Sequence, residues 1–109
     1  MKYCTVYCTA PNKEDAERIS TELVKKKLVA CCNIIEGVTS VFVWQGELNK
    51  DEEVLIIMKT RTELFKKVRT EIKKLHKYEV PEIIAMPIEA VNDDYAKWMD
   101  EQTDYESKK

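Results

Sequence analysis

Apolar and polar residues alternate along this chain with two different periods, and each change of period separates two elements. Residues 2–9 carry apolar side chains at every second position, which is typical of a half-buried β-strand. Pro11 ends this strand, and Asn12 is a residue type that favours the N-cap of a helix. Apolar residues then recur every three or four positions, which predicts an amphipathic helix over residues 13–28.

The middle of the chain is rich in β-branched and aromatic residues and predicts a long β-hairpin. Its first strand covers residues 31–45, a turn covers residues 46–51, and the returning strand covers residues 52–60. Gly37 interrupts the first strand, which predicts a bend or a bulge at that position.

The last part of the chain returns to helical spacing and then alternates again. Apolar positions predict a second helix over residues 62–75, and Thr60 with Glu63 fits a capping box at its start. A short apolar strand is predicted at residues 83–88, and Asn92 is expected to begin a final short helix.

The predicted order is strand, helix, strand, strand, helix and strand, followed by one further helix. This order predicts the α+β class and a ferredoxin-like βαββαβ sandwich with an extra C-terminal helix. Right-handed crossovers place the two main helices on one face of a four-stranded antiparallel sheet. Residues 1–103 are expected to form a single domain, and the polar tail 104–109 is expected to be disordered.

The predicted hairpin is too long for the domain that carries it. Its first strand extends roughly 45–50 Å at about 3.3 Å per residue, whereas a domain of this length is on the order of 35 Å across. The excess exposes apolar side chains, namely Val41, Phe42, Val43, Trp44 and Leu48. Because exposed apolar strands pair with other chains, we predict a homo-oligomer formed through the 31–60 hairpin. The alternative is a sharp bend at Gly37 that folds the excess back.

Composition and charge narrow the class of protein. The chain has 109 residues, with 18 Lys and Arg against 20 Asp and Glu and a net charge of −2. Nucleic-acid binding is not expected, because the basic excess of such proteins is missing. No apolar run approaches the roughly 20 residues that span a bilayer, and no secretory signal is readable. We therefore expect no membrane span and a cytoplasmic location.

The four cysteines divide into two groups. Cys4, Cys31 and Cys32 are interpreted as buried thiols that pack as small hydrophobic residues. Cys8 differs, because it ends the first strand, where ligands reach the edge of a sheet in α/β units. The spacing contains no CxxC motif, so a structural zinc site is unsupported.

His76 is the only histidine, and it ends the second predicted helix. Two interpretations stay open: it complements the helix dipole, or it acts as a metal ligand or proton carrier. Glu79 and Glu82 follow closely enough to supply carboxylate oxygens, although both could equally be solvated. The sequence has no nucleophile elbow, glycine-rich phosphate loop or HExxH motif, so no enzymatic activity is expected.

Several segments together resemble the divalent-cation-tolerance (CutA) family. They are CTAP at 8–11, ACCNII at 30–35, GVTSVFVWQGEL at 37–48, KT at 59–60, LHKYEVPEI at 75–83 and YAKW at 95–98. The resemblance implies a ferredoxin-like homotrimer, similar to nitrogen-regulatory P-II proteins, in which the long hairpin pairs between subunits. It also implies binding of copper or another divalent cation in the response to metal ions, with no organic cofactor.

The resemblance further implies where ligands bind. The candidate metal ligands are Cys8, His76 and Glu79. Lys77 stands where the family usually has proline, and its ammonium would disfavour a cation beside it. A cleft at a subunit interface is expected to hold Trp44, Lys59, Tyr78 and Trp98 beside Cys8 and His76, and it is equally consistent with a small-molecule site. The alternative function is a P-II-like module that senses a small ligand or anchors partner proteins, which the sequence does not identify, with incidental metal binding.

Overall fold

The computed structural model describes residues 1–103, so the disorder predicted for residues 104–109 lies outside the described residues. In chain order the elements are β1 (Tyr3–Ala10), α1 (Lys13–Lys25), β2 (Cys31–Trp44), β3 (Glu47–Arg61), the 3-10 turn η1 (Thr62–Leu64), α2 (Phe65–Leu75), β4 (Ile84–Pro87) and α3 (Asp93–Gln102). This order confirms the one predicted from the periodicity. Within the described residues, no helix is both long enough and apolar enough to span a membrane.

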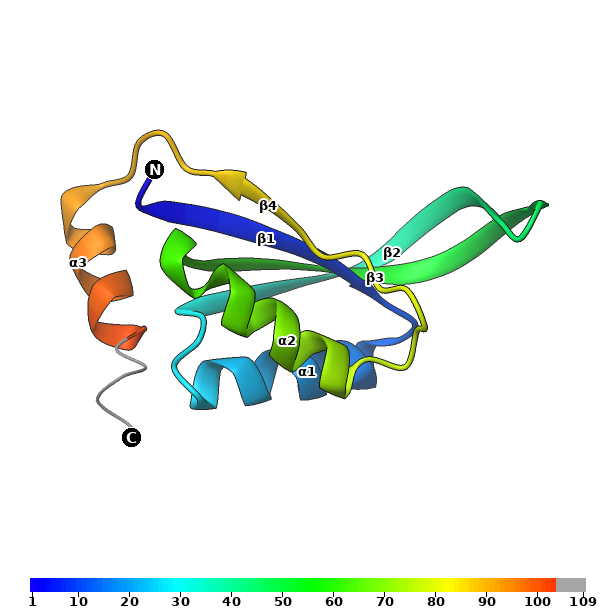
Figure 1. Ribbon diagram of the computed structural model, residues 1–109, viewed down its shortest axis with the longest axis horizontal. Coiled ribbons are helices and arrows are strands. Elements are labelled where there is room, and N and C mark those ends of the chain that lie inside the picture. Colours follow the sequence, from blue (N-terminus) through cyan, green and yellow to red (C-terminus); the bar gives the residue numbers. More distant parts are fainter. Residues whose placement is uncertain (104–109) are drawn as a thin grey trace.

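The four strands form one antiparallel sheet in the order β2-β3-β1-β4. Figure 1 shows α1 and α2 on one face of this sheet, with α3 at the end of the molecule opposite the hairpin tip. The predicted α+β fold, with a four-stranded antiparallel sheet and three helices, is confirmed.

The core lies between the sheet and the two helices. Cys4, Val6 and Cys8 alternate on the inner face of β1 and are buried, as a period of two predicts. The fully buried side chains of the helices and of β3 that pack in this core include Ile19, Leu23, Ile56, Met58, Val68 and Ile72. The interpretation of Cys31 as a buried thiol is wrong, because its side chain lies on the sheet face away from the core and stays partly exposed. Cys32 is also partly exposed, but it packs against the core.

The two main helices begin in different ways. Asn12 caps α1 as predicted, because its side-chain oxygen accepts the backbone N–H of Asp15 at 2.8 Å. The capping box predicted at Thr60 and Glu63 is wrong. Thr60 is a buried residue of β3, and its hydroxyl donates to the carbonyl of Leu28 at 2.6 Å. Strand pairing therefore continues through the position that was expected to start the helix.

Substitution of Thr60 by valine tests this buried hydrogen bond. Thr60→Val keeps the size of the side chain but removes a donor to the carbonyl of Leu28, so we expect the free energy of unfolding to fall by about 1–3 kcal/mol. The control is Thr70→Val, because Thr70 donates to the carbonyl of Lys66 at 2.9 Å on an exposed surface where water replaces it. Urea unfolding at one protomer concentration measures both variants, and equal losses would contradict the assignment.

The β2–β3 hairpin extends beyond the domain, as the strand lengths predict. The molecule measures 44 × 30 × 21 Å, and the hairpin projects past the ends of α1 and α2 (Figure 1). Gly37, with φ of +78°, lies at a shift in the β2–β3 register, which confirms the bulge without folding the hairpin back. The turn contains only Gln45 and Gly46, both with positive φ, so pairing resumes at Glu47, earlier than predicted.

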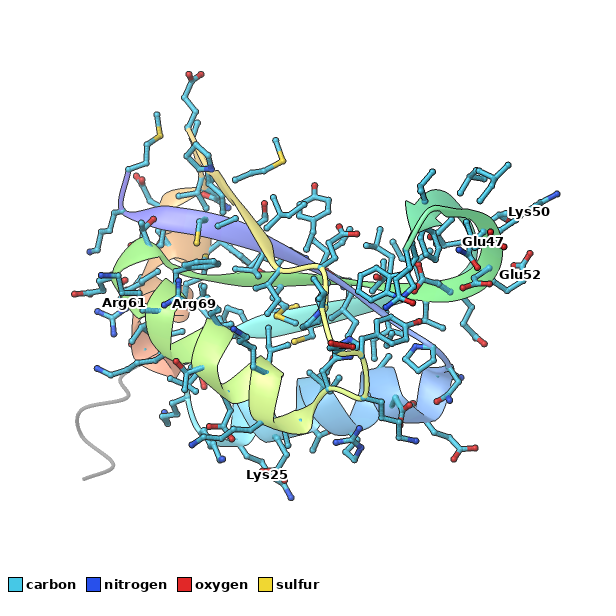
Figure 2. All side chains as sticks on the ribbon, turned by 45° about the vertical axis from the view of Figure 1, so that its right-hand side comes forward. Lys25, Glu47, Lys50, Glu52, Arg61 and Arg69 are labelled. Atoms are coloured by element: carbon cyan, nitrogen blue, oxygen red, sulfur yellow. The ribbon has the colours of Figure 1, made fainter. Side chains whose placement is uncertain are left out.

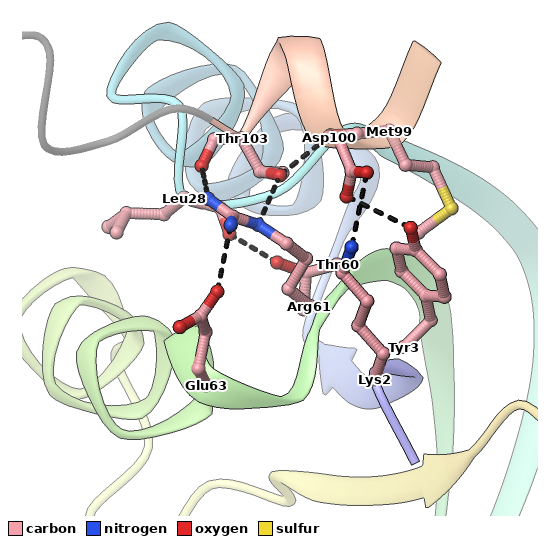
Figure 3. A network of polar contacts seen from close by, with 9 residues as sticks. All are labelled: Lys2, Tyr3, Leu28, Thr60, Arg61, Glu63, Met99, Asp100 and Thr103. Atoms are coloured by element: carbon pink, nitrogen blue, oxygen red, sulfur yellow. Dashed lines mark hydrogen bonds and ion pairs between the residues drawn. The ribbon is translucent and has the colours of Figure 1, made fainter. Parts of the chain in front are cut away.

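A polar network fastens α3 to the start of β1 and the end of β3 (Figure 3). The carboxylate of Asp100 accepts a hydrogen bond from the Tyr3 hydroxyl at 2.9 Å and pairs with the Lys2 ammonium at 3.3 Å. The Nε of Arg61 donates to the hydroxyl of Thr103 at 2.9 Å. These bonds hold α3 at the end of the sheet that lies away from the hairpin tip.

Candidate functional site

A cleft of about 750 Å³ lies between the overhanging hairpin and the segment that follows α2. Its lining residues are Thr9, Ser40, Val41, Phe42, Trp44, Asn49, Asp51, Glu53, Lys77, Tyr78, Glu79, Val80 and Glu82. The volume lies within the range of small-molecule sites, which is roughly 300–1,000 Å³.

The hairpin wall of the cleft follows from the register of its strands. Ser40, Phe42 and Trp44 are spaced two residues apart and therefore share one face of β2. Asp51 lies directly across from Ser40 on β3. Glu53 continues the same face two residues further along β3. Neither Asp51 nor Glu53 was expected from the sequence. Because the two residues are two positions apart, they share one face of β3, and the pairing of β2 with β3 shows that this face lines the cleft.

The opposite wall is held in place by His76, the C-cap of α2. The Nε2 of its ring lies 2.7 Å from the carbonyl of Thr9 at the end of β1. Its Nδ1 accepts the backbone N–H of Tyr78 at 3.1 Å. An Nδ1 that accepts leaves Nε2 as the donor to Thr9. The imidazole therefore links the end of β1 to the segment after α2, and both of its nitrogens are engaged.

Tyr78 crosses the cleft to the hairpin. Its hydroxyl donates to Oε2 of Glu53 at 2.6 Å, and its ring lies 4.7 Å from the ring of His76. Burial and the adjacent Glu53 carboxylate raise the pKa of the Tyr78 phenol well above its usual value. The phenol therefore stays protonated and acts as a hydrogen-bond donor to Glu53.

The cleft carries an excess of negative charge. Four carboxylates line it, those of Asp51, Glu53, Glu79 and Glu82. Among the described lining residues only Lys77 is basic, and its ammonium lies 3.2 Å from Oδ1 of Asp15, which is outside the lining. The charge of Lys77 is thus compensated from another element, and the carboxylates in the cleft keep their attraction for cations.

The three predicted metal ligands differ in their surroundings. Glu79 lines the cleft. Cys8 is fully buried, and burial raises the pKa of its thiol to about 12, so the thiol is neutral near pH 7. His76 uses both ring nitrogens within the fold. In the part of the chain that the structure describes, no group of three or more His, Cys, Asp or Glu side chains could hold a metal ion. The assignment of these ligands stays a prediction.

The four residues predicted to share a cleft do not all meet in this chain. Trp44 and Tyr78 line the cleft, whereas Lys59 and Trp98 do not. Lys59 lies six residues beyond Glu53 on β3, about 20 Å along the strand, where its ammonium bonds to the side chain of Asn33. Trp98 packs against the ring of Tyr95 on α3, at the end of the molecule opposite the hairpin tip.

Comparison with known proteins assigns the family. Residues 4–102 match the family model described as the CutA1 divalent ion tolerance protein. The chain belongs to the CutA1 family. It is 45% identical over 98 residues to the divalent-cation tolerance protein CutA of Thermus thermophilus, covering 90% of this chain and 95% of that protein.

Solved CutA structures share the fold. The CutA protein of Archaeoglobus fulgidus superposes with a TM-score of 0.91 at 42% identity, covering 94% of this chain and 99% of that chain. That protein is described as periplasmic, and the cytoplasmic location predicted for this chain stays a prediction. The chloroplastic CutA of Arabidopsis thaliana is 40% identical across 90% of this chain, which spans about half (54%) of that longer protein.

Proposed function

We propose that the protein is a homotrimer that binds divalent cations, copper among them, in the acidic cleft beside its hairpin. The family, which is named for tolerance of divalent ions, supports this role. The observation that carries the proposal is the set of four carboxylates in a cleft whose single lysine is compensated from outside. Carboxylates arranged in this way raise the local concentration of cations.

The donor chemistry of the cleft supports weak, oxygen-based binding. Carboxylate oxygens suit Mg²⁺, Ca²⁺ and Mn²⁺, whereas Cu²⁺ and Zn²⁺ gain more from imidazole or thiolate. Glu79 is the predicted ligand that faces the cleft. For Cys8 and His76 to bind copper, the thiol would have to ionise and the imidazole would have to leave one of its backbone partners.

The hairpin supports the trimer. Val43 and Leu48 are cross-strand partners outside the lining of the cleft, and 67% and 77% of their surfaces are exposed in the single chain. Glu47, Lys50 and Glu52 also lie on the projecting part of the hairpin (Figure 2). An apolar centre with a polar rim is the usual anatomy of a protein interface. The sheet order, with two helices on one face, supports the ferredoxin-like, P-II-like class in which such assemblies are expected.

Removal of cleft carboxylates tests the cation site. For Glu79→Gln/Glu82→Gln we expect the affinity for Mn²⁺ and Cu²⁺ to fall about tenfold in calorimetric titration, because two of four attracting charges are lost. The control is Glu14→Gln/Glu17→Gln, which removes the same charge from the exposed face of α1.

A second pair of variants separates the two donor sets. Because the Cys8 thiol is buried and both ring nitrogens of His76 are hydrogen-bonded within the fold, we expect Cys8→Ala/His76→Ala to keep most of the Mn²⁺ affinity of the unmodified protein. Unchanged affinity in the Glu79/Glu82 pair would contradict a site at the cleft carboxylates. Loss of copper binding in the Cys8/His76 pair alone would place the copper site at the thiol and the imidazole.

The size of the cleft favours the second candidate function, the sensing of a small ligand. At about 750 Å³ the cleft is far larger than a bare ion requires. Thermal-shift screening of metabolites against metal-free protein tests this function, because a ligand that binds the native state raises the melting temperature.

A further inference from the structure

We infer that the same cleft binds a small organic cation, an alkylammonium compound, through its aromatic rings and the carboxylate of Glu53. This ligand class goes beyond the divalent cations proposed above. The inference holds whether or not metal ions bind, because it rests on different contacts.

A buried carboxylate without a cationic partner is the first observation. Glu53 is 8% exposed, and its one hydrogen-bond partner among residues 1–103 is the hydroxyl of Tyr78, at 2.6 Å. Within those residues no ammonium or guanidinium forms an ion pair with it, and Lys77, the one basic residue of the described lining, pairs with Asp15. A buried charge without an opposite charge is costly. A cation that enters the cleft would give this carboxylate an opposite charge.

The aromatic wall is the second observation. Phe42 and Trp44 share one face of β2, Tyr78 lines the cleft from the segment after α2, and Val41 and Val80 add aliphatic surface. Trp44 and Phe42 are 43% and 38% exposed, so their rings are accessible in the single chain. Aromatic faces attract ammonium groups within about 6 Å of the ring centroid, and they also cover the alkyl groups that surround the nitrogen.

An organic cation needs different contacts from a metal ion, so the two proposals for this cleft rest on different features. A metal ion needs several donor atoms within about 2.0–2.6 Å, and the described residues contain no such group of three acidic, His or Cys side chains. An alkylammonium ion needs only a nearby carboxylate and an apolar wall. It also fills a volume of about 750 Å³ far better than a bare ion does.

Trp44 provides the readout, because the other tryptophan, Trp98, lies outside the cleft. In a Trp98→Phe background and in the presence of EDTA, we expect choline to change the fluorescence of Trp44 saturably. The uncharged compound of the same shape, 3,3-dimethyl-1-butanol, should bind at least tenfold more weakly. In the Trp44→Phe protein, where Trp98 alone fluoresces, choline should cause no change.

Charge removal completes the experiment. Glu53→Gln keeps an oxygen that accepts the Tyr78 hydroxyl but removes the charge, and we expect choline affinity to fall tenfold or more. Asp51→Asn, on an exposed residue of the same wall, should weaken binding less and provides a variant that does not alter a buried group. The matched control is Glu14→Gln on α1, which should bind choline unchanged.

Three results would each overturn the inference. They are no saturable response to choline, equal affinity for the uncharged compound, and unchanged affinity in both Glu53→Gln and Asp51→Asn. Because EDTA removes divalent ions, a failure here leaves the Mn²⁺ titration of Glu79→Gln/Glu82→Gln unaffected. A failure of that titration likewise leaves the choline result standing.

Discussion

The double variant Val43→Lys/Leu48→Lys is expected to be monomeric, with the 12.8 kDa mass of a single chain, whereas the unmodified protein should have three times that mass. The two residues are cross-strand partners and are largely exposed in the single chain, so the substitutions leave the core intact. In the proposed trimer the same side chains are covered. Two lysine ammonium groups buried there without partners would each cost several kcal/mol. Light scattering coupled to gel filtration measures the masses.

A charge-matched control distinguishes the hairpin from the rest of the surface. Thr21→Lys/Val24→Lys adds the same two charges to exposed positions of α1 and should keep the full mass of the assembly. Circular dichroism should show both double variants folded. A monomeric unmodified protein, or a hairpin variant that keeps the full mass, would refute assembly through this face.

The second large effect concerns the thiol of Cys8. At pH 8 we expect iodoacetamide to modify it on the order of a thousandfold more slowly than an ordinary exposed thiol. Burial raises the pKa of Cys8 to about 12, and the thiolate is the reactive form. Mass spectrometry after timed quenching gives the rate at each cysteine, and the protein unfolded in guanidinium provides the control in which all four react. Equal rates for Cys8 in the native and unfolded protein would contradict the burial.

The raised pKa of Cys8 also predicts how stability depends on pH. In the unfolded chain the thiol ionises near its ordinary pKa of about 8.5, whereas in the native protein it keeps its proton until about pH 12. The stabilisation is therefore fully present below about pH 8.5 and is lost as the pH rises toward 12. Urea unfolding at several pH values should show a smaller decline for Cys8→Ala, which lacks the thiol.

Much of the fold was predictable because local spacing determines it. The alternation of Cys4, Val6 and Cys8 identified the inner face of β1, and the side chain of Asn12 caps α1 as its residue type predicts. The length of the hairpin predicted an overhang from geometry alone. The bulge at Gly37 follows from the conformational freedom of glycine. Each of these features depends on residues that are neighbours in the sequence.

The candidate site depended on contacts that the sequence pattern does not contain. His76 and Glu79 could be named from their residue types, but the bonds of His76 to the carbonyl of Thr9 and to the Tyr78 amide appear only in the folded chain. The same holds for Glu53, which reaches the cleft because the β2–β3 register places it on the face of Trp44.

By itself, the sequence determined the order of the elements, the inner face of β1 and a hairpin longer than its domain. The spacing of apolar residues involves only near neighbours, and the length of a strand follows from its number of residues. Only the tertiary structure decided which side chains share the cleft. It separated Lys59 and Trp98 from Trp44 and Tyr78, and it buried the thiol of Cys8. The physical reason is that strand register and the path of the chain after α2 bring together residues far apart in sequence, and no local spacing encodes their distances.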